Sequence, residues 1–360
     1  MEPKEKVFIA GSNGMVGSAI KKLLLQKGYL TNISKGKLFS PRPAKWFVQR
    51  SNVGNTGADY YFSKNPEFGA VFTYHLSNDY KTKKELRQEK ERNLNKNKID
   101  VPFPGWNSLD AEKQEAPAQV ILTIQDKDGN IINKIKQNAS KGSHRIVWDL
   151  EHFNPFAISM SGGAGYGGGV LVTPGTYKAS LHLEEDGKIL KLDGPLSFQV
   201  KPIRKGVLKG ASFEEYNEFR VELTQLINKI SKVEDQFIQS KKMYNAFEKA
   251  LQRSRIAPGM IEPKLLELKV AIASTDKLMN GSSSRSEIGE RNPSGIQNYL
   301  YGAFSGMDSS YGPTGLHKKS LSTAKKILDK VQGMVNKILY SMIPEIEKKL
   351  KDAGAPYISN

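Results

Sequence analysis

The spacing of hydrophobic residues changes along the chain, and each change predicts a different kind of structure. Val7 to Ala10 is a short apolar run typical of a buried parallel strand, and the residues after it follow a helical pattern. From about Phe68 to Pro202, apolar and polar residues alternate, which predicts strands. From Ser212 onward, apolar residues recur at alternating steps of three and four, which predicts long helices.

The alternating region predicts an antiparallel β-sandwich of immunoglobulin-like type over residues 68–203. Asp128-Gly129 and Asp186-Gly187 lie between candidate strands and match tight hairpin turns, because their second residue tolerates positive φ. Short strands with few helices between them are typical of such a sandwich. The candidate strands are Ala70–Leu76, Gln119–Gln125, Arg145–Asp149, Thr176–Leu183 and Leu196–Val200.

Residues 78–116 interrupt the alternating pattern. This stretch is polar, and its run Lys81–Arg92 mixes basic and acidic residues, which is typical of a solvated insertion or an exposed helix. We therefore expect a polar insertion between two strands of the sandwich.

The C-terminal region predicts an antiparallel helical bundle over residues 212–352. Ser212 and Glu215 form a capping box, and the first apolar stripe after it extends the helix to residue 254. Leu265–Ile272 and Leu321–Met342 supply two further stripes, and three matching stripes favour packing within one chain. Binding of another protein to one stripe is the alternative.

Two features interrupt this bundle. Residues 280–315 are rich in Ser and Gly and predict a long loop, with one short helix near Ile296–Phe304. Pro344 should kink or interrupt the last helix, because proline lacks a backbone N–H group and clashes with the preceding turn.

The N-terminal residues predict the start of a dinucleotide-binding unit. Gly11, Gly14 and Gly17 follow the first strand at a spacing of three and lead into a helix. Glycines in this position permit a tight turn, close approach of a pyrophosphate and close helix–strand packing. They are the candidate cofactor-binding residues.

The segment VFIAGSNGMVGSAI, continued by KGYLTNI, resembles the opening of the GDP-L-fucose synthase family, which are NADP-dependent epimerase–reductases. The resemblance covers residues 7–33 and implies NADP binding.

The expected enzyme does not continue after residue 33. Residues 34–67 contain prolines and predict a linker or extended segment, so residues 1–33 are expected to form a truncated Rossmann βα unit. Tyr60 and Lys64 have the spacing of the family's catalytic pair, but the 42 residues between Gly17 and Tyr60 are too few for the intervening units. We therefore expect no catalytic residues.

A second resemblance covers residues 37–351. The segments LFSPRPA, GSHRIVWDL, VTPGTYK and SYGPT resemble the region that follows the β-propeller in bacterial sortilin-like, BNR-repeat proteins, a family often labelled glycosyl hydrolases. The resemblance implies a small immunoglobulin-like module followed by a helical tail, in a family that is typically exported. The propeller and its Ser-x-Asp-x-Gly-x-Thr-Trp repeats are absent from this chain, so we expect no activity that the propeller carries.

Composition narrows the function classes. The net charge of +17 suggests nucleic-acid binding, but the basic residues are scattered among acids, and we expect no nucleic-acid partner. The chain has no cysteine, which excludes disulfides and thiolate metal sites. No apolar run is long enough for a membrane span or a signal peptide, so a cytoplasmic location is expected for the chain as written.

Other motifs have ordinary structural explanations. The glycine-rich segment 161–169 lacks the ending of a phosphate-binding loop and predicts an inter-strand loop. Asp126, Asp128 and Asn130 suggest calcium, but a hairpin turn explains them. Trp148 predicts a core residue instead of a sugar platform. The histidines lack metal-ligand spacing, and no metal is expected; they are His75, His144, His152, His182 and His317.

Two hypotheses of function follow. The first is a non-catalytic interaction or scaffold protein that binds an unidentified protein or glycan partner and needs no cofactor. The second is an NADP-dependent oxidoreductase or epimerase of the fucose-synthase kind, whose enzyme body is incomplete in this chain. Whether the helical stripes also mediate oligomerisation is left open.

Overall fold

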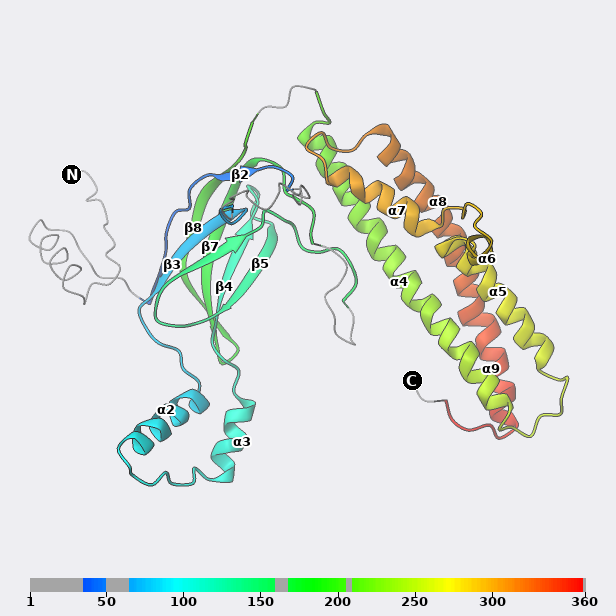
Figure 1. The fold of residues 1–360 in the computed structure, drawn as a ribbon, viewed down its shortest axis with the longest axis horizontal. Coiled ribbons are helices and arrows are strands. Elements are labelled where there is room, and N and C mark those ends of the chain that lie inside the picture. The colour runs from blue at the N-terminus through cyan, green and yellow to red at the C-terminus, as the bar shows by residue number, and fades with distance from the viewer. Residues whose placement is uncertain (1–34, 50–64, 159–167, 205–208, 359–360) are drawn as a thin grey trace, which may run out of the picture. The chain divides into compact units, whose positions relative to one another are not determined.

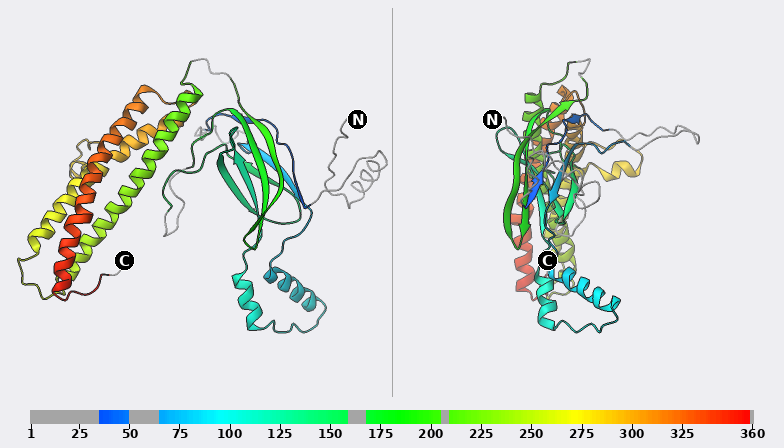
Figure 2. Two further views of the ribbon diagram at one scale, coloured as in Figure 1. Left: turned by 180° about the vertical axis from the view of Figure 1, so that it is seen from behind. Right: turned by 90° about the vertical axis from the view of Figure 1, so that its left-hand side faces the viewer.

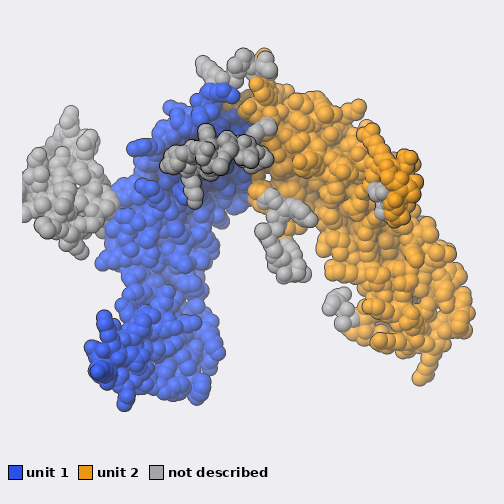
Figure 3. All heavy atoms as spheres, viewed as in Figure 1, with its two compact units in different colours: residues 1–153, 174–204 blue, residues 154–173, 205–360 orange. Residues whose placement is uncertain are grey.

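The computed structural model describes residues 35–49, 65–158, 168–204 and 209–358. The chain divides into two compact units (Figure 3), of which unit 1 comprises 1–153 with 174–204 and unit 2 comprises 154–173 with 205–360. Unit 1 holds all the described strands, and unit 2 is helical. The prediction that the chain combines β-sheets with helices is confirmed.

Unit 1 contains two β-sheets (Figure 1). The three-stranded sheet is antiparallel, with the order β1-β3-β6, and its strands are Gly36–Leu38, Ala70–Leu76 and Gly142–Trp148. The five-stranded sheet has the order β2-β8-β7-β4-β5. Its strands are β2 Ala44–Trp46, β8 Lys188–Pro202, β7 Gly175–Glu185, β4 Gln119–Gln125 and β5 Ile131–Asn138.

Aromatic side chains join the two sheets. The ring of Phe72 in β3 meets that of Phe198 in β8 edge-on, with 5.1 Å between their centroids. The ring of Trp148 in β6 lies 5.6 Å from that of Tyr177 in β7, and its Nε1–H donates to the Glu151 carbonyl oxygen at 2.9 Å. Trp148 is fully buried, which confirms its prediction as a core residue. The indole thus buries a large apolar area while its polar atom keeps a partner.

Both predicted hairpin turns are confirmed. Gly129, between β4 and β5, has a φ of +91°. Between β7 and β8, Asp186 and Gly187 have φ values of +50° and +72°. Glycine adopts this left-handed conformation without steric cost, and aspartate tolerates it better than most residues.

Residues 36–46 differ from the predicted linker. β1 pairs antiparallel with β3 and β2 pairs parallel with β8, so one short segment contributes to both sheets and the five-stranded sheet is not purely antiparallel. Pro41 and Pro43 lie between the two strands, and proline cannot donate to a ladder. Each strand therefore has only three residues, too few to display an alternating pattern.

Unit 2 consists of helices, several of them long (Figure 2). The long helices coincide with the predicted stripes. The first helix, predicted over 212–254, is α4. The Ser212–Glu215 capping box is present, with Glu215 N–H donating to Ser212 Oγ at 3.1 Å. The short helix α7 has the predicted bounds. The elements are α4 Phe213–Leu251, α5 Glu262–Asn280, α6 Ser283–Glu287, α7 Ile296–Phe304, a 3₁₀ turn Ser305–Met307, α8 Gly315–Lys337, a π-helical turn Ile338–Met342 and α9 Ile343–Asp352.

The predicted interruption near Pro344 is confirmed. Pro344 lies in the first turn of α9, and the π-helical turn precedes it directly. Because proline has no N–H group, the carbonyl of Tyr340 cannot receive the usual α-helical hydrogen bond from residue 344. The last predicted stripe residue, Met342, is only half buried, and Ile343 is buried instead.

Two hydrophobic clusters stabilise unit 2. One packs the first half of α4 against α7 and α8, and the other packs the end of α4 against α5 and α9. Ser240 and Thr275 are buried hydroxyl residues on α4 and α5. Their hydroxyls donate to the carbonyls of Gln236 and Ala271, one turn earlier, at 2.9 and 2.8 Å. These bonds within each helix satisfy polar groups that would otherwise be costly to bury.

The connection between β6 and β7 belongs to the helical unit, although the sequence places it within the sandwich. Val170 is buried in the first cluster, and the ring of Phe156 lies 6.0 Å from that of Phe304. The hydroxyl of Tyr216 donates to the Leu171 carbonyl oxygen at 3.2 Å. The segment carries no periodic pattern that would assign these residues to a helical core.

Val170 should therefore contribute to the stability of unit 2. We expect Val170→Ala to lower the free energy of unfolding of that unit by about 2 kcal/mol, because it removes two buried methyl groups and leaves a cavity. Thermal unfolding followed by circular dichroism measures this. Ile158→Ala is the matched control, since Ile158 is 95% exposed in the same connection. Equal effects of the two changes would contradict the packing described here.

Candidate interaction site

The polar insertion between β3 and β4 forms two helices, α2 Lys83–Lys96 and α3 Trp106–Gln114. β3 lies in the three-stranded sheet and β4 in the five-stranded sheet, so the insertion connects the two layers of unit 1. In Figure 1 the two helices lie side by side beyond the ends of these strands. Neither helix contains a buried residue. We call α2, α3 and their connection the hairpin.

Capping interactions define both ends of α2. Thr82 caps its start, with Glu85 N–H donating to Thr82 Oγ1 at 3.2 Å and Thr82 N–H donating to Glu85 Oε2 at 2.9 Å. At its end, Lys98 has a φ of +56°, and Ile99 N–H donates to the Leu94 carbonyl oxygen at 3.0 Å. A left-handed residue followed by such a bond terminates a helix and turns the chain sharply.

Arg87 joins the two helices, and a second hydrogen bond, from Lys83 N–H to Glu115 Oε2 at 2.6 Å, links the start of α2 to the end of α3. Arg87 Nε and Nη2 donate to the two carboxylate oxygens of Glu112 on α3 at 2.6 and 2.8 Å, and Nη1 donates to Glu91 Oε1 at 2.6 Å. Their side chains are largely covered, with 23% of Arg87 and 8% of Glu112 exposed. Hydrogen bonding from Arg87 lowers the pKa of Glu112 below its ordinary value. A guanidinium group that donates two parallel hydrogen bonds to one carboxylate fixes the relative orientation of the two side chains and also pairs their charges. This contact, the Arg87 fork, therefore sets how α3 lies against α2.

The connection between the helices carries exposed apolar side chains. We define the hairpin tip as Ile99, Val101, Phe103 and Trp106, which are 54%, 37%, 62% and 72% exposed. The Phe103 and Trp106 rings pack edge to face, with 5.0 Å between their centroids. Val101 and Phe103 each precede a proline, which favours extended backbone at those positions. The apolar side chains of the tip are therefore exposed to solvent and are not part of a hydrophobic core.

The chain that leads from α2 into the tip is rich in basic residues. From Arg92 to Trp106 the sequence has three cations, Arg92, Lys96 and Lys98, and one carboxylate, Asp100. Among the described residues, none of these cations is in an ion pair. By contrast, Glu89 pairs with Lys81 at 2.7 Å, and Glu91 and Glu112 pair with Arg87. The uncompensated charge near the tip is thus positive.

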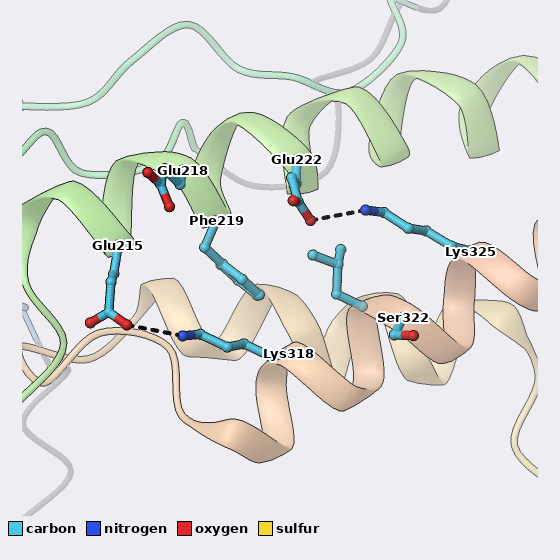
Figure 4. A pocket seen from close by; sticks show the side chains of 8 residues that line it. Glu215, Glu218, Phe219, Glu222, Lys318, Ser322 and Lys325 are labelled. Carbon is cyan, nitrogen blue, oxygen red and sulfur yellow. Dashed lines mark hydrogen bonds and ion pairs between the residues drawn. The ribbon is translucent and has the colours of Figure 1, made fainter.

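A hollow lies between α4 and α8 in unit 2 (Figure 4) and has a volume of about 350 Å³. Lys318 Nζ lies 3.3 Å from Glu215 Oε1, and Lys325 Nζ lies 2.9 Å from Glu222 Oε2. The hollow is lined by Glu215, Glu218, Phe219, Glu222, Lys318, Leu321, Ser322 and Lys325. Both ion pairs are exposed, and in each pair the lysine charge is neutralised by a glutamate. Phe219 and Leu321 belong to the hydrophobic core beneath the hollow. The hollow is therefore a seam between packed helices.

The glycines predicted to bind a cofactor, Gly11, Gly14 and Gly17, lie outside the described residues. The same holds for Tyr60, Lys64 and the greater part of the glycine-rich segment 161–169. The structure therefore brings none of these residues to a described site, and the hypothesis of NADP binding stays a prediction.

The remaining motifs have local roles in the structure. The carboxylate of Asp126 accepts hydrogen bonds from Asp128 N–H at 3.0 Å and Asn130 N–H at 2.9 Å, so it organises the turn. His75 bonds Ser143, His144 bonds Ser140, and His317 Nδ1 accepts from Thr314 N–H at the start of α8. Burial lowers the pKa of His182, with Lys191 adding to the effect. Over the part of the chain that the structure describes, no group of three potential metal ligands is found.

Sequence reasoning did not single out the residues of the hairpin tip. They follow neither a helical nor an alternating period, so no periodic signal marks them. A signal was nevertheless present, because Val101-Pro-Phe-Pro-Gly-Trp106 is an apolar run within an otherwise charged stretch.

Comparisons with known proteins give little support for an assignment. No protein-family model matches the chain, and no curated protein matches it. The crystal structure of FlgD from P. aeruginosa is similar over 21% of this chain and 47% of that protein, with 25% sequence identity and a TM-score of 0.15. The chain thus spans less than half of FlgD, and a match of this extent supports no inference about fold or function. In the described residues, no helix is long and apolar enough to cross a membrane.

The Arg87–Glu112 pair should make the hairpin sensitive to acid. Because the pKa of Glu112 is lowered in the folded state, its contribution is fully present above the ordinary glutamate pKa of about 4.3 and is lost as the pH falls through the lowered value. We expect amide signals of α2 and α3 to lose dispersion in this acid range, as NMR spectra over a pH titration would record.

The matched variants are Arg87→Ala and Arg92→Ala, two arginines on one helix; within the described part of the chain, only Arg87 is in an ion pair. Arg87→Ala should weaken the packing of α3 against α2 already at neutral pH, so the amide signals of both helices should lose dispersion. Arg92→Ala should leave this packing intact. If Arg87→Ala left the amide spectrum of α3 unchanged, the arginine would not be what holds the helices together.

Proposed function

We propose that the chain is a non-catalytic interaction module that binds a macromolecular partner through the hairpin tip. The observation that carries this proposal is the grouping of four exposed apolar side chains on a hairpin whose helices bury no residue. Single exposed apolar residues are common, but a cluster rimmed by polar residues marks an interaction surface. Tryptophan is also among the residues that contribute most to binding energy at interfaces.

The contacts within the hairpin favour this role. The Arg87 fork fixes the two helices, and Pro102 and Pro104 restrict the connection between them. Binding through a surface that is already ordered costs less conformational entropy than binding through a flexible loop. A small apolar surface can therefore give useful affinity.

The rest of the chain, in this proposal, is a scaffold for the hairpin. Unit 1 is an immunoglobulin-like sandwich, a reading supported by the aromatic contacts between its sheets and by the edge segment that passes from one sheet to the other. Unit 2 is an antiparallel bundle, supported by its buried stripes. Residues 37–351 would then correspond to the region after the propeller in sortilin-like, BNR-repeat proteins.

The alternative function, an NADP-dependent oxidoreductase or epimerase, rests on Gly11, Gly14 and Gly17. A dinucleotide normally binds across two βαβ halves of a sheet, and the sequence offers one strand and one helix. We expect no saturable binding when NADPH is titrated into the purified protein and its fluorescence is followed. Micromolar binding that disappears in a Gly14→Val variant would favour the enzyme instead.

Site-specific photo-crosslinking tests the interaction module. A photoreactive amino acid placed at Trp106 in the full chain, expressed in cells, should give adducts with a protein, glycan or lipid. The matched control places it at Tyr340, which is 71% exposed in unit 2, against 72% for Trp106. Adducts at position 106 that do not exceed those at position 340 would exclude the tip as a binding surface.

A further inference from the structure

We propose that the partner of the hairpin tip is the surface of a lipid bilayer that contains anionic lipids. This inference rests on the proposed function, since both place binding at the tip, and it adds the chemical class of the partner. It concerns attachment to one face of a membrane and requires no membrane-spanning helix.

The apolar side chains of the tip suit an interface between water and hydrocarbon. Phe103 and Trp106 are adjacent in space and exposed, and Ile99 and Val101 extend the same connection. Tryptophan is enriched at bilayer interfaces because its ring is apolar while its N–H group prefers a polar environment. A protruding loop of this kind can enter the headgroup region without a complementary groove.

The charges around the tip match an anionic surface. Arg92, Lys96 and Lys98 are outside any ion pair among the described residues, and they outnumber Asp100, the one carboxylate between Arg92 and Trp106. The nearby Glu91 is engaged by Arg87. Apolar side chains flanked by lysine and arginine are the combination that attaches peripheral proteins to anionic bilayers.

A lipid surface is favoured over an acidic protein because the connection that forms the tip lies at the end of the hairpin away from the sheets (Figure 1). A protein partner would have to supply a groove shaped for Phe103 and Trp106 together with carboxylates for the flanking cations. A bilayer supplies a deformable apolar region under a layer of negative charge and needs no such match. An acidic protein partner is therefore treated as an outcome of the test.

The distribution of tryptophans gives a direct readout. The chain has three tryptophans, of which Trp46 and Trp148 are 7% and 0% exposed and Trp106 is 72% exposed. A change in intrinsic fluorescence on binding therefore reports on Trp106. We would mix the full chain with vesicles of phosphatidylcholine, with or without phosphatidylglycerol, and record emission and co-sedimentation. With phosphatidylglycerol we expect a blue shift, quenching by brominated lipid and recovery of protein with the vesicles.

Two tip variants and one control make the test specific. Phe103→Ser with Trp106→Ser should abolish co-sedimentation, and Lys96→Gln with Lys98→Gln should weaken it by about tenfold or more. Lys326→Gln with Lys330→Gln removes the same charge from exposed positions of α8, outside any ion pair among the described residues, and should have little effect. The substituted side chains are exposed, so unchanged thermal unfolding would establish that each variant is folded.

Four results would overturn the lipid inference. They are equal binding to neutral and anionic vesicles, equal loss in the α8 control, binding that survives both tip variants, and no vesicle binding at all. If the last result came with photo-crosslinks from position 106 to a protein, the interaction module would stand and its partner would be a protein. If position 106 gave no adduct either, both proposals would fail.

Discussion

The contact between the two sheets of unit 1 is the constraint on which the hairpin depends. Phe72, Trp148 and Phe198 hold the three-stranded sheet against the five-stranded one. The hairpin leaves β3 in the first sheet and returns to β4 in the second. Packed sheets lie about 10 Å apart, and packed helices lie about 8–10 Å apart. The two sheets therefore bring the ends of the insertion close enough for its helices to pack, and the Arg87 fork with the Lys83–Glu115 hydrogen bond aligns them.

Local signals in the sequence predict local structure well. The capping box at Ser212, the turn glycines Gly129 and Gly187 and the stripe of α4 all act within a few residues, and the structure follows them. The pairing of β2 with β8 could not be predicted in this way, because its partners are more than 150 residues apart and β2 has three residues. The same limit applies to Val170, whose burial depends on helices that come later in the chain.

The candidate site was less predictable than the fold for a related reason. The sequence indicated an exposed helix in the insertion, yet the aromatic tip lies between periodic elements, where hydrophobic spacing carries no information. The residues that hold it in place, Arg87 and Glu112, are 25 positions apart and look like ordinary surface charges. Their importance comes from a geometry that only the folded chain reveals.

The π-helical turn before Pro344 has a consequence for how α8 and α9 keep one continuous apolar face. Along α8 the buried residues advance by three or four, as from Leu328 to Val331 and Val335, but Ile338 and Ile343 are separated by five. One extra residue would rotate every later side chain by about 100° in a continuous α-helix and turn the apolar face of α9 outward. The wider turn absorbs that residue, so the phase of the stripe resets. The chain thus carries a one-residue insertion in its repeat as a local bulge, without displacing the helix that follows.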